Sequence, residues 1–204
     1  YLIMGELSLD GSLQPIKGAL PIAVKAREEG FKGFILPSQN AKEAAIVNDL
    51  KVYGVDNINQ VIEHFDKDNH IEETIINTRE EFYKNLDFPE FDFADVKGQE
   101  SIKRCMEIAA AGGHNIILIG PPGSGKTMLS KRLPSILPPM SLKEALETTK
   151  IHSVAGRVKE HSGLMVERPF RSPHHTISDV ALVGGGAYPQ PGEISLSHNG
   201  VLFL

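Results

Sequence analysis

The sequence predicts an α/β protein, and three observations lead to that prediction. Segments typical of strands alternate with segments typical of helices between residues 33 and 65. A glycine-rich motif at residues 120–127 follows an apolar run and precedes a helical pattern. Of the 204 residues, 41% are hydrophobic, which is enough to bury one sizeable core or two small ones.

The first 65 residues carry local signals for a hairpin followed by helices and strands in turn. The predicted elements are a hairpin over 6–16, a helix over 19–29, a strand over 33–36, a helix over 40–48, a strand over 51–55 and a helix over 58–65. Asp10 and Gly11 form the tight-turn pair of the hairpin, and Gly30 suits a helix C-cap. Asn40, with Glu43 three residues later, predicts a capping box.

This first part resembles the C-terminal half of the Lon protease domain, over about residues 1–65. The resemblance rests on Gly5-Glu6-Leu7-Ser8-Leu9 and on Leu13-Gln14-Pro15-Ile16. In Lon-type proteases a lysine just beyond this stretch assists a serine nucleophile, and Leu20 stands at the matching position here. A leucine can neither deprotonate nor orient a serine, and Lys17 lies three residues too early. The resemblance therefore implies a non-proteolytic domain with a structural, oligomerising or partner-binding role.

Residues 66–92 form a predicted acidic linker, with at best one solvated helix over 71–83. Residues 63–95 hold 3 Lys/Arg against 11 Asp/Glu, a net charge of −8. Residues 96–204 hold 12 Lys/Arg against 8 Asp/Glu, a net charge of +4. The basic C-terminal half is compatible with a polyanionic partner.

The motif at 120–127 predicts a phosphate-binding loop. Its residues are Gly120, Pro121, Pro122, Gly123, Ser124, Gly125, Lys126 and Thr127. The glycines let backbone N–H groups curl around phosphate oxygens, Lys126 can reach the β- and γ-phosphates, and the Thr127 hydroxyl can ligate Mg²⁺. A buried strand is predicted to enter the loop over 114–119, and a helix to leave it over 128–133, stopped by Pro134. The predicted cofactors are therefore ATP and Mg²⁺, with Lys126 and Thr127 as the catalytic residues.

The segment that precedes the loop resembles the start of an AAA+ ATPase module. The stretch Val96-Lys97-Gly98-Gln99-Glu100, the helix predicted over 101–111 and the strand before the loop carry this resemblance. In that family the first segment flanks the adenine, which implies that Val96, Gly98 and Gln99 contact the base. The expected fold is then an AAA+ parallel sheet flanked by helices, preceded by part of a Lon-like α/β domain.

The lone cysteine and the lack of a long apolar run bear on the compartment. A single Cys105 excludes an internal disulfide framework and suits a reducing cytoplasm. No apolar run approaches the ~20 residues that span a bilayer, so no membrane association is expected. Cys105 shares helical spacing with Ile102, Met106 and Ala109, which predicts a core position rather than a nucleophile.

The last quarter of the chain closely resembles the magnesium-chelatase-like AAA+ proteins. The resemblance rests on Phe170-Arg171-Ser172-Pro173-His174-His175-Thr176, on Gly184-Gly185-Gly186 and on residues 191–204. With a Lon-like domain in front, the match is to the YifB/ComM subgroup. This resemblance implies a hexameric, ATP-driven motor. It further implies a DNA helicase that promotes branch migration during natural transformation, as ComM proteins do.

The insertion before the final strand resembles one that lines the central channel of the ring in this clade. Arg168, Arg171, His174 and His175 are then candidates for contact with DNA phosphates. Local packing or binding of the neighbouring subunit stays open for each of them. Adjacent His174 and His175 would point apart in an extended strand, a geometry that disfavours a metal site.

The segments around this insertion complete the expected module, which divides the chain into 1–65 (Lon-like), 66–92 (linker) and 93–204 (AAA+). Ser141 with Glu144 predicts a capping box that opens a helix to about residue 153, packed on the sheet. Residues 201–204 predict a buried parallel strand. In P-loop ATPases the residues after that strand carry the Walker B acids that hold Mg²⁺, so these 204 residues are expected to bind nucleotide and hydrolyse ATP negligibly.

Two other functions stay open. One is the ATPase subunit of a metal-inserting chelatase, against which the Lon-like front domain counts. The other is an ATP-dependent Lon-like protease, against which Leu20 counts.

Overall fold

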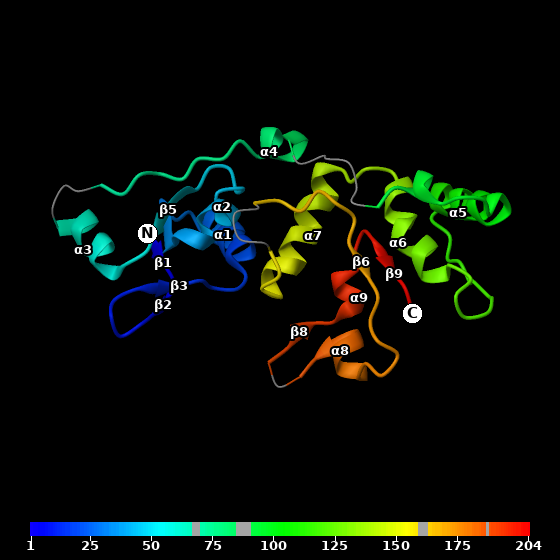
Figure 1. The fold of residues 1–204 in the computed structure, drawn as a ribbon. Helices are drawn as coiled ribbons and strands as arrows, with labels where there is room; N and C mark the ends of the chain where they lie inside the picture. The colour runs from blue at the N-terminus through cyan, green and yellow to red at the C-terminus, as the bar shows by residue number, and fades with distance from the viewer. Residues whose placement is uncertain (67–69, 85–90, 159–162, 187) are drawn as a thin grey trace. The chain divides into compact units, whose positions relative to one another are not determined.

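The computed structural model describes residues 1–66, 70–84, 91–158, 163–186 and 188–204 (Figure 1). The chain forms two compact units. The first comprises Tyr1–Asn85 and Ala145–Met165, and the second comprises Leu86–Glu144 and Val166–Leu204. Among the helices described, none is long and apolar enough to cross a membrane. The fold is α/β, with a parallel sheet flanked by helices, as the sequence predicts.

The first unit is built on a three-stranded parallel sheet (Figure 1). In sheet order its strands are β1 (Leu2–Ile3), β4 (Gly33–Pro37) and β5 (Lys51–Val55). Its helices are α1 (Ala19–Glu28), α2 (Ser38–Ala44), α3 (Ile58–Asp66) and α4 (Thr78–Lys84). The predicted hairpin forms as β2 (Glu6–Leu7) and β3 (Leu13–Gln14), paired antiparallel. The predicted helices over 19–29 and 58–65 and the strands over 33–36 and 51–55 are confirmed.

The core of the first unit lies around β4. Phe34, Ile35 and Leu36 are fully buried there, because a parallel strand is covered on both faces. Leu20 of α1 is also fully buried. Its backbone N–H donates to Glu43 Oε1 at 3.0 Å.

The predicted capping box of Asn40 and Glu43 is wrong. Helix α2 begins two residues earlier, at Ser38. Asn40 Oδ1 accepts from the Ile16 N–H at 2.8 Å, and Asn40 Nδ2 donates to the Ile16 carbonyl at 2.9 Å. Both Asn40 and Glu43 are 7% exposed, and they bind backbone groups of Ile16 and Leu20 instead of capping their own helix.

The predicted linker packs on the first unit over the part that is described. The Thr74 N–H donates to the Val52 carbonyl at 2.8 Å, and Thr78 Oγ1 donates to the Ile46 carbonyl at 2.9 Å. Helix α4 is therefore not solvated on all sides, since Phe82 is 8% exposed. Residues 67–69 and 85–90 of the predicted linker lie outside the described residues.

The second unit contains the glycine-rich loop. Its elements begin with η1 (Phe93–Asp95), α5 (Glu100–Gly112) and α6 (Lys126–Ile136). They end with β6 (Phe170–Arg171), α8 (Asp179–Val183), β7 (Gly184–Gly185), β8 (Gln190–Pro191), α9 (Glu193–Leu196) and β9 (Val201–Leu202). Phe93, Val96, Met106 and Leu129 form a buried cluster between these first helices. Strand β6 pairs in parallel with β9, and β7 pairs antiparallel with β8.

Helix α7 (Leu142–Val154) begins in the second unit, and from Ala145 onward its residues group with the first. Thr148 and Thr149 are fully buried, and the Gly18 N–H donates to the Ser153 carbonyl at 3.0 Å. The prediction that this helix packs on the sheet of an AAA+ module therefore does not describe its contacts. The division of the chain at residues 65 and 92 stays a prediction.

Residues 114–119 do not form the predicted buried strand. They belong to neither a helix nor a strand, and Ile117 and Ile119 are 85% and 95% exposed. The final strand is parallel as predicted, yet β9 pairs with β6 and is only half-buried, and Leu204 is 81% exposed. Hydrogen-bond partners, not hydrophobicity alone, decide whether an apolar run becomes a strand.

Two details of the second unit also differ from the predictions. Helix α6 includes Pro134 and ends at Ile136, because a proline in the last turn removes a single donor to the carbonyl of Ser130. Cys105 is exposed. The buried stripe of α5 is centred on Met106, Ala109 and Ala110, which leaves Cys105 at its margin.

Candidate nucleotide-binding site

The loop of residues 120–125 leads directly into the first turn of α6. The helix begins at Lys126, and no side chain caps its N-terminus. Gly123 and Gly125 have φ of +79° and +86°, a left-handed conformation that other residues adopt at a cost. The sequence therefore places glycine where the loop reverses, and the uncapped N–H groups of α6 are left to bind an anion.

Lys126 closes the loop on itself. Its Nζ donates to the carbonyls of Gly120 and Pro121, both at 2.8 Å, and lies 3.4 Å from Ser124 Oγ. Thr127 follows on the first turn and is exposed. An ammonium group and a hydroxyl therefore stand at the mouth of the loop, beside the start of the helix dipole.

The segment 96–99 reaches the loop through Gln99. Gly98 and Gln99 have φ of +66° and +58°, and a Cβ on Gly125 would lie 3.5 Å from Gln99 Nε2. Val96 is 2% exposed within the buried cluster, so its side chain is not available to a base. Of the three residues expected to contact adenine, Gln99 is the one whose side chain the structure brings to the loop.

Sequence reasoning missed Arg132, which fastens this segment to α6. Its Nε donates to the Asp92 carbonyl at 3.1 Å, and its Nη2 lies 3.6 Å from the Asp95 carboxylate. Its guanidinium also lies 5.5 Å from the centre of the Phe91 ring. Ser135 Oγ adds a bond from the Phe93 N–H at 3.1 Å. Only Asp92 and Asp95, acids just before Val96, hinted at a basic partner.

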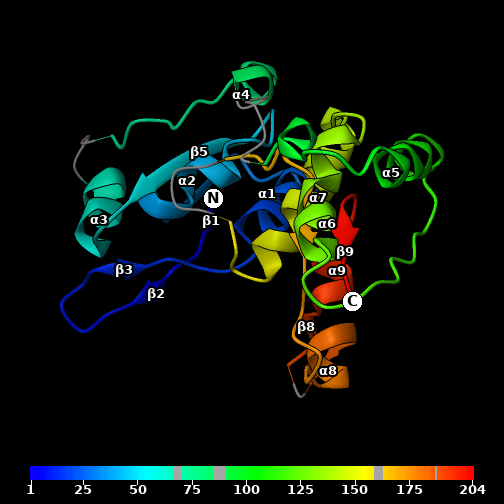
Figure 2. The same cartoon turned by 45° about the vertical axis from the view of Figure 1, so that its right-hand side comes forward.

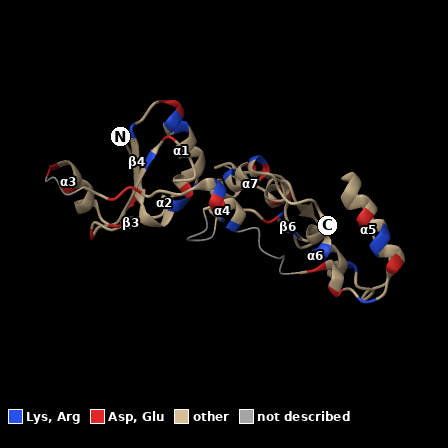
Figure 3. Ribbon diagram, turned by 90° about the horizontal axis from the view of Figure 1, so that it is seen from above, with Lys and Arg blue, Asp and Glu red and all other residues tan. Residues whose placement is uncertain are grey.

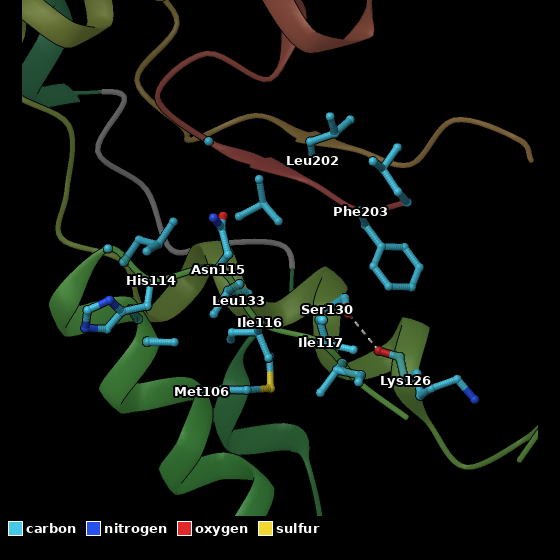
Figure 4. Close-up of a pocket in the computed structure, with 18 residues that line it drawn as sticks. Met106, His114, Asn115, Ile116, Ile117, Lys126, Ser130, Leu133, Leu202 and Phe203 are labelled. Carbon is cyan, nitrogen blue, oxygen red and sulfur yellow. Dashed lines mark hydrogen bonds between the residues drawn. The ribbon is translucent and has the colours of Figure 1, made fainter. Parts of the chain in front are cut away.

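A cavity of about 610 Å³ lies beside the loop. Its lining comes from α5, residues 113–118, α6 and residues 200–204. Figure 4 shows Leu202 and Phe203 on one side and Met106 and Ile116 on the other, with the amino end of Lys126 pointing away. The loop, and not this cavity, holds the uncapped helix N-terminus that suits phosphate groups.

Charged residues of both signs lie along α5 (Figure 3). Arg104 pairs with Glu107 at 3.0 Å, and Lys103 pairs with Glu100 at 3.3 Å. The net positive charge of this half of the chain is therefore not concentrated on α5.

Of the residues predicted to contact DNA, both arginines are engaged within the chain. Arg168 donates to the carbonyls of Pro138 and Asn199 at 2.6 and 2.7 Å, and its side chain is 14% exposed. Arg171 donates through Nε and Nη2 to the two carboxylate oxygens of Glu193, at 2.5 and 2.6 Å. A role in DNA binding would require either guanidinium to leave these partners.

The two histidines are exposed, and they do not point apart as predicted. The His174 and His175 rings lie 4.0 Å apart between centroids, tilted by 36°. His174 Nδ1 lies 2.8 Å from Thr176 Oγ1. A turn, with the Ile177 N–H donating to the His174 carbonyl at 2.9 Å, replaces the expected extended strand.

The predicted capping box of α7 is confirmed. The Ser141 N–H donates to Glu144 Oε2 at 2.7 Å, and the Glu144 N–H donates to Ser141 Oγ at 3.3 Å. The bond from the Ser141 N–H and a second one from Ser141 Oγ to Glu144 Oε2 at 3.0 Å, with the nearby Arg168 guanidinium, lower the pKa of the Glu144 carboxyl. Arg168 Nη2 lies 3.4 Å from Glu144 Oε1 and joins this cap to the start of β9 through Asn199.

An α/β fold with a Gly-x4-Gly-Lys-Thr loop before a helix N-terminus defines a P-loop protein. A family model described as Magnesium chelatase, subunit ChlI, matches residues 92–204. A second, described as Subunit ChlI of Mg-chelatase, matches residues 1–40. The chain belongs to the magnesium-chelatase-like AAA+ family, in the group that includes YifB and ComM.

Relatives match over the whole of this chain. The YifB protein of Escherichia coli K12 is 43% identical over 204 residues, which are 39% of its own length. The Competence protein ComM of Haemophilus influenzae is 40% identical over 205 residues, 40% of its length. An archaeal Lon protease of Halobacterium salinarum is 28% identical over 110 residues, 54% of this chain and 16% of its own length. The chain thus spans about 40% of the length of the YifB and ComM relatives.

Proposed function

We propose that this chain is the nucleotide-binding part of an ATP-driven motor that acts on DNA in the cytoplasm. The observation that carries the proposal is the loop at the start of α6. There two glycines with positive φ, an uncapped helix N-terminus and Lys126 stand together. Loops of this kind bind phosphate through backbone N–H groups, and the helix dipole adds to the attraction.

ATP and Mg²⁺ fit the residues present. The N–H groups from Gly123 to Thr127 would hold the phosphates, and Lys126 would exchange its carbonyl partners for phosphate oxygens. The exposed Thr127 hydroxyl would help to hold Mg²⁺, which would neutralise phosphate charge. Gln99 would border the base from its place beside Gly125.

Action on DNA rests on the relationship with ComM and on the sequence resemblance described above. As the resemblance to the YifB/ComM subgroup implies, we propose a helicase that promotes branch migration during natural transformation, with a hexameric ring as its assembly. The first unit is proposed to be non-proteolytic. Leu20, at the position where Lon-type proteases carry a lysine, is fully buried.

Nucleotide binding tests the first half of the proposal. We expect this chain to bind a fluorescent ADP analogue in the presence of Mg²⁺, and Lys126→Ala to weaken binding at least about tenfold. Lys131→Ala is the matched control, because Lys131 is an exposed lysine of the same helix. Equal binding by the Lys126→Ala variant would contradict the proposal that this loop binds the phosphates of the nucleotide.

The rate of ATP hydrolysis by the full-length protein tests the second half. Stimulation by single-stranded or branched DNA supports the motor. The matching family model describes a chelatase subunit, which favours the ATPase subunit of a metal-inserting chelatase as the alternative function. Stimulation by a porphyrin and metal-chelatase partner system, with none by DNA at low salt, would replace the DNA motor with that function.

A further inference from the structure

Residues 91–99 follow helix α6 from its last turns back to its first residue. At one end of this segment, the Asp92 carbonyl accepts from Arg132 Nε. At the other end, Gln99 Nε2 lies 3.5 Å from the position that a Cβ on Gly125 would take, and Gly125 directly precedes α6. Helix α5, which follows the segment, lies to the right of α6 in Figures 1 and 2. The segment therefore connects the last turns of α6 to the phosphate-binding loop at its start.

The middle of the segment is held on α6 by burial. Val96 is 2% exposed and belongs to the buried cluster that includes Leu129. Leu129 lies four residues after Gly125 and three before Arg132, so the three contacts fall on one face of the helix. Apolar burial is not directional, so it keeps the segment on α6 without fixing its orientation there. The hydrogen bonds at the Arg132 end supply that direction.

Arg132 makes these directional contacts with a side chain that is 17% exposed. Its Nη1 donates to the Met128 carbonyl of the same helix at 3.2 Å, which orients the guanidinium on α6. From there Nε reaches the Asp92 carbonyl at 3.1 Å, and Nη2 lies 3.6 Å from the Asp95 carboxylate. The Asp92 carboxylate accepts from the Ala94 N–H at 2.8 Å and so caps the turn that Arg132 holds. One planar group thus joins α6 to a capped turn.

Gln99 is the part of the segment that a ligand can reach. It is exposed, and its side chain makes no capping bond to α5, the helix that it precedes. A carboxamide offers both a donor and an acceptor, whereas the oxygens of ionised phosphates only accept. The sugar and base of a nucleotide carry groups of both kinds. Gln99 therefore suits the nucleoside half of a nucleotide whose phosphates lie in the loop.

We infer that Arg132 is a positioning residue for nucleotide recognition. It holds residues 91–99 in the orientation that places Gln99 beside Gly125, and it thereby acts on the nucleoside half of the ligand without touching it. The inference rests on the proposed function, since it takes a nucleotide as the ligand of the loop. Lys126, by contrast, binds carbonyl groups within the loop itself, so the phosphate half of the site does not depend on Arg132.

Calorimetric titration of the full-length protein with two ligands separates the two halves. ADP carries a nucleoside and phosphates, whereas inorganic tripolyphosphate carries phosphates alone. In the presence of Mg²⁺, we expect Arg132→Met to weaken ADP binding about 5- to 20-fold and to change tripolyphosphate binding by less than about twofold. Methionine keeps an apolar stem in place of the arginine, and retained tripolyphosphate binding shows that the loop is folded in the variant.

Arg104→Met is the matched control. Arg104 is a 72% exposed arginine of α5 that pairs with Glu107 of the same helix. Its replacement should leave the affinities for both ligands unchanged. A loss of ADP binding in this variant as large as in Arg132→Met would overturn the inference, because any arginine near the site would then have the same effect.

A double variant tests whether Arg132 acts through Gln99. Gln99→Asn withdraws the amide by one methylene, and asparagine tolerates the φ of +58° at this position. With Gln99→Asn already present, Arg132→Met should weaken ADP binding by less than a further factor of about two. Losses that multiply as if the two sites were independent would overturn the inference.

The remaining outcomes distinguish this inference from the proposed function. Equal loss of ADP and tripolyphosphate binding in Arg132→Met would reduce Arg132 to a support of the fold, and no loss of either would exclude a role in binding. If the unmodified protein binds ADP no better than tripolyphosphate, the nucleoside is not recognised and the inference fails while the phosphate loop stands. If it binds neither ligand, the proposed function fails and the inference fails with it.

Discussion

Arg171→Ala distinguishes a structural role from a DNA-binding role for this arginine. In the structure its guanidinium donates to both carboxylate oxygens of Glu193, at 2.5 and 2.6 Å, and so joins β6 to α9. The two side chains are 28% and 12% exposed. A pair with this geometry and shielding is held more firmly than a surface ion pair.

The expected loss follows from that geometry. A hydrogen bond to a charged group contributes about 1.5–3 kcal/mol, and partial exposure lets water hydrate the carboxylate that remains. We therefore expect Arg171→Ala to lower the free energy of unfolding of the second unit by about 2 kcal/mol. In a double-mutant cycle with Glu193→Gln, the combined loss should fall short of the sum by about 1 kcal/mol or more.

Urea unfolding followed by circular dichroism measures the loss, and amide hydrogen exchange locates it. The localisation matters because two compact units need not unfold in one step. The Phe203 N–H, which donates to the Arg171 carbonyl at 2.8 Å, should exchange faster in the variant. Arg104→Ala is the matched control, since Arg104 is 72% exposed in its pair with Glu107 and should change stability by less than about 0.5 kcal/mol.

DNA binding supplies the result that would refute this reasoning. If Glu193 keeps the guanidinium, the salt dependence of DNA binding should be unchanged in Arg171→Ala. Unchanged stability, together with a salt slope reduced by about one, would instead make Arg171 a phosphate contact.

Other predictions follow from single contacts. Asn40→Ala should lower the free energy of unfolding of the first unit by about 2–4 kcal/mol in urea, because the N–H and carbonyl of Ile16 lose their buried partner. Bonds from Ser141 lower the pKa of the Glu144 carboxyl. The stabilisation that the ionised carboxylate provides is therefore complete above its ordinary pKa of 4.5, and it is lost as the pH falls through the lowered pKa. Glu144→Gln should therefore weaken the fall in melting temperature below pH 4.5, and an unchanged profile would contradict this. Gly125→Ala should weaken binding of the fluorescent ADP analogue about tenfold, because alanine at φ +86° costs about 1–2 kcal/mol; equal affinity would show that the loop relaxes.

Short-range signals in the sequence predicted several parts of the structure correctly. The capping box of Ser141 and Glu144 formed because both partners lie within one turn of α7. The hairpin over 6–16 and the glycines of the loop depend on turn conformations that single residues impose. The motif at 120–127 could therefore be placed at the start of a helix from the sequence alone.

The predictions that failed share one cause, because the residues concerned bind partners that are distant in the sequence. Asn40 and Glu43 had the spacing of a capping box, yet burial brought them to residues 16 and 20, whose backbone groups needed partners. Arg132, which holds the segment before Val96, acts on Asp92, 40 positions away. No local pattern encodes such contacts.

The sequence by itself determined the chemistry of the loop, because a phosphate site needs glycine, lysine and threonine at fixed spacing. The tertiary structure decided which other charged residues remain free to bind a ligand. Glu193 and the carbonyls of Pro138 and Asn199 engage the two arginines that the family resemblance offered to DNA. The physical reason is that a guanidinium held by acceptors of its own chain is no longer a free surface charge, and only the folded chain brings those acceptors to it.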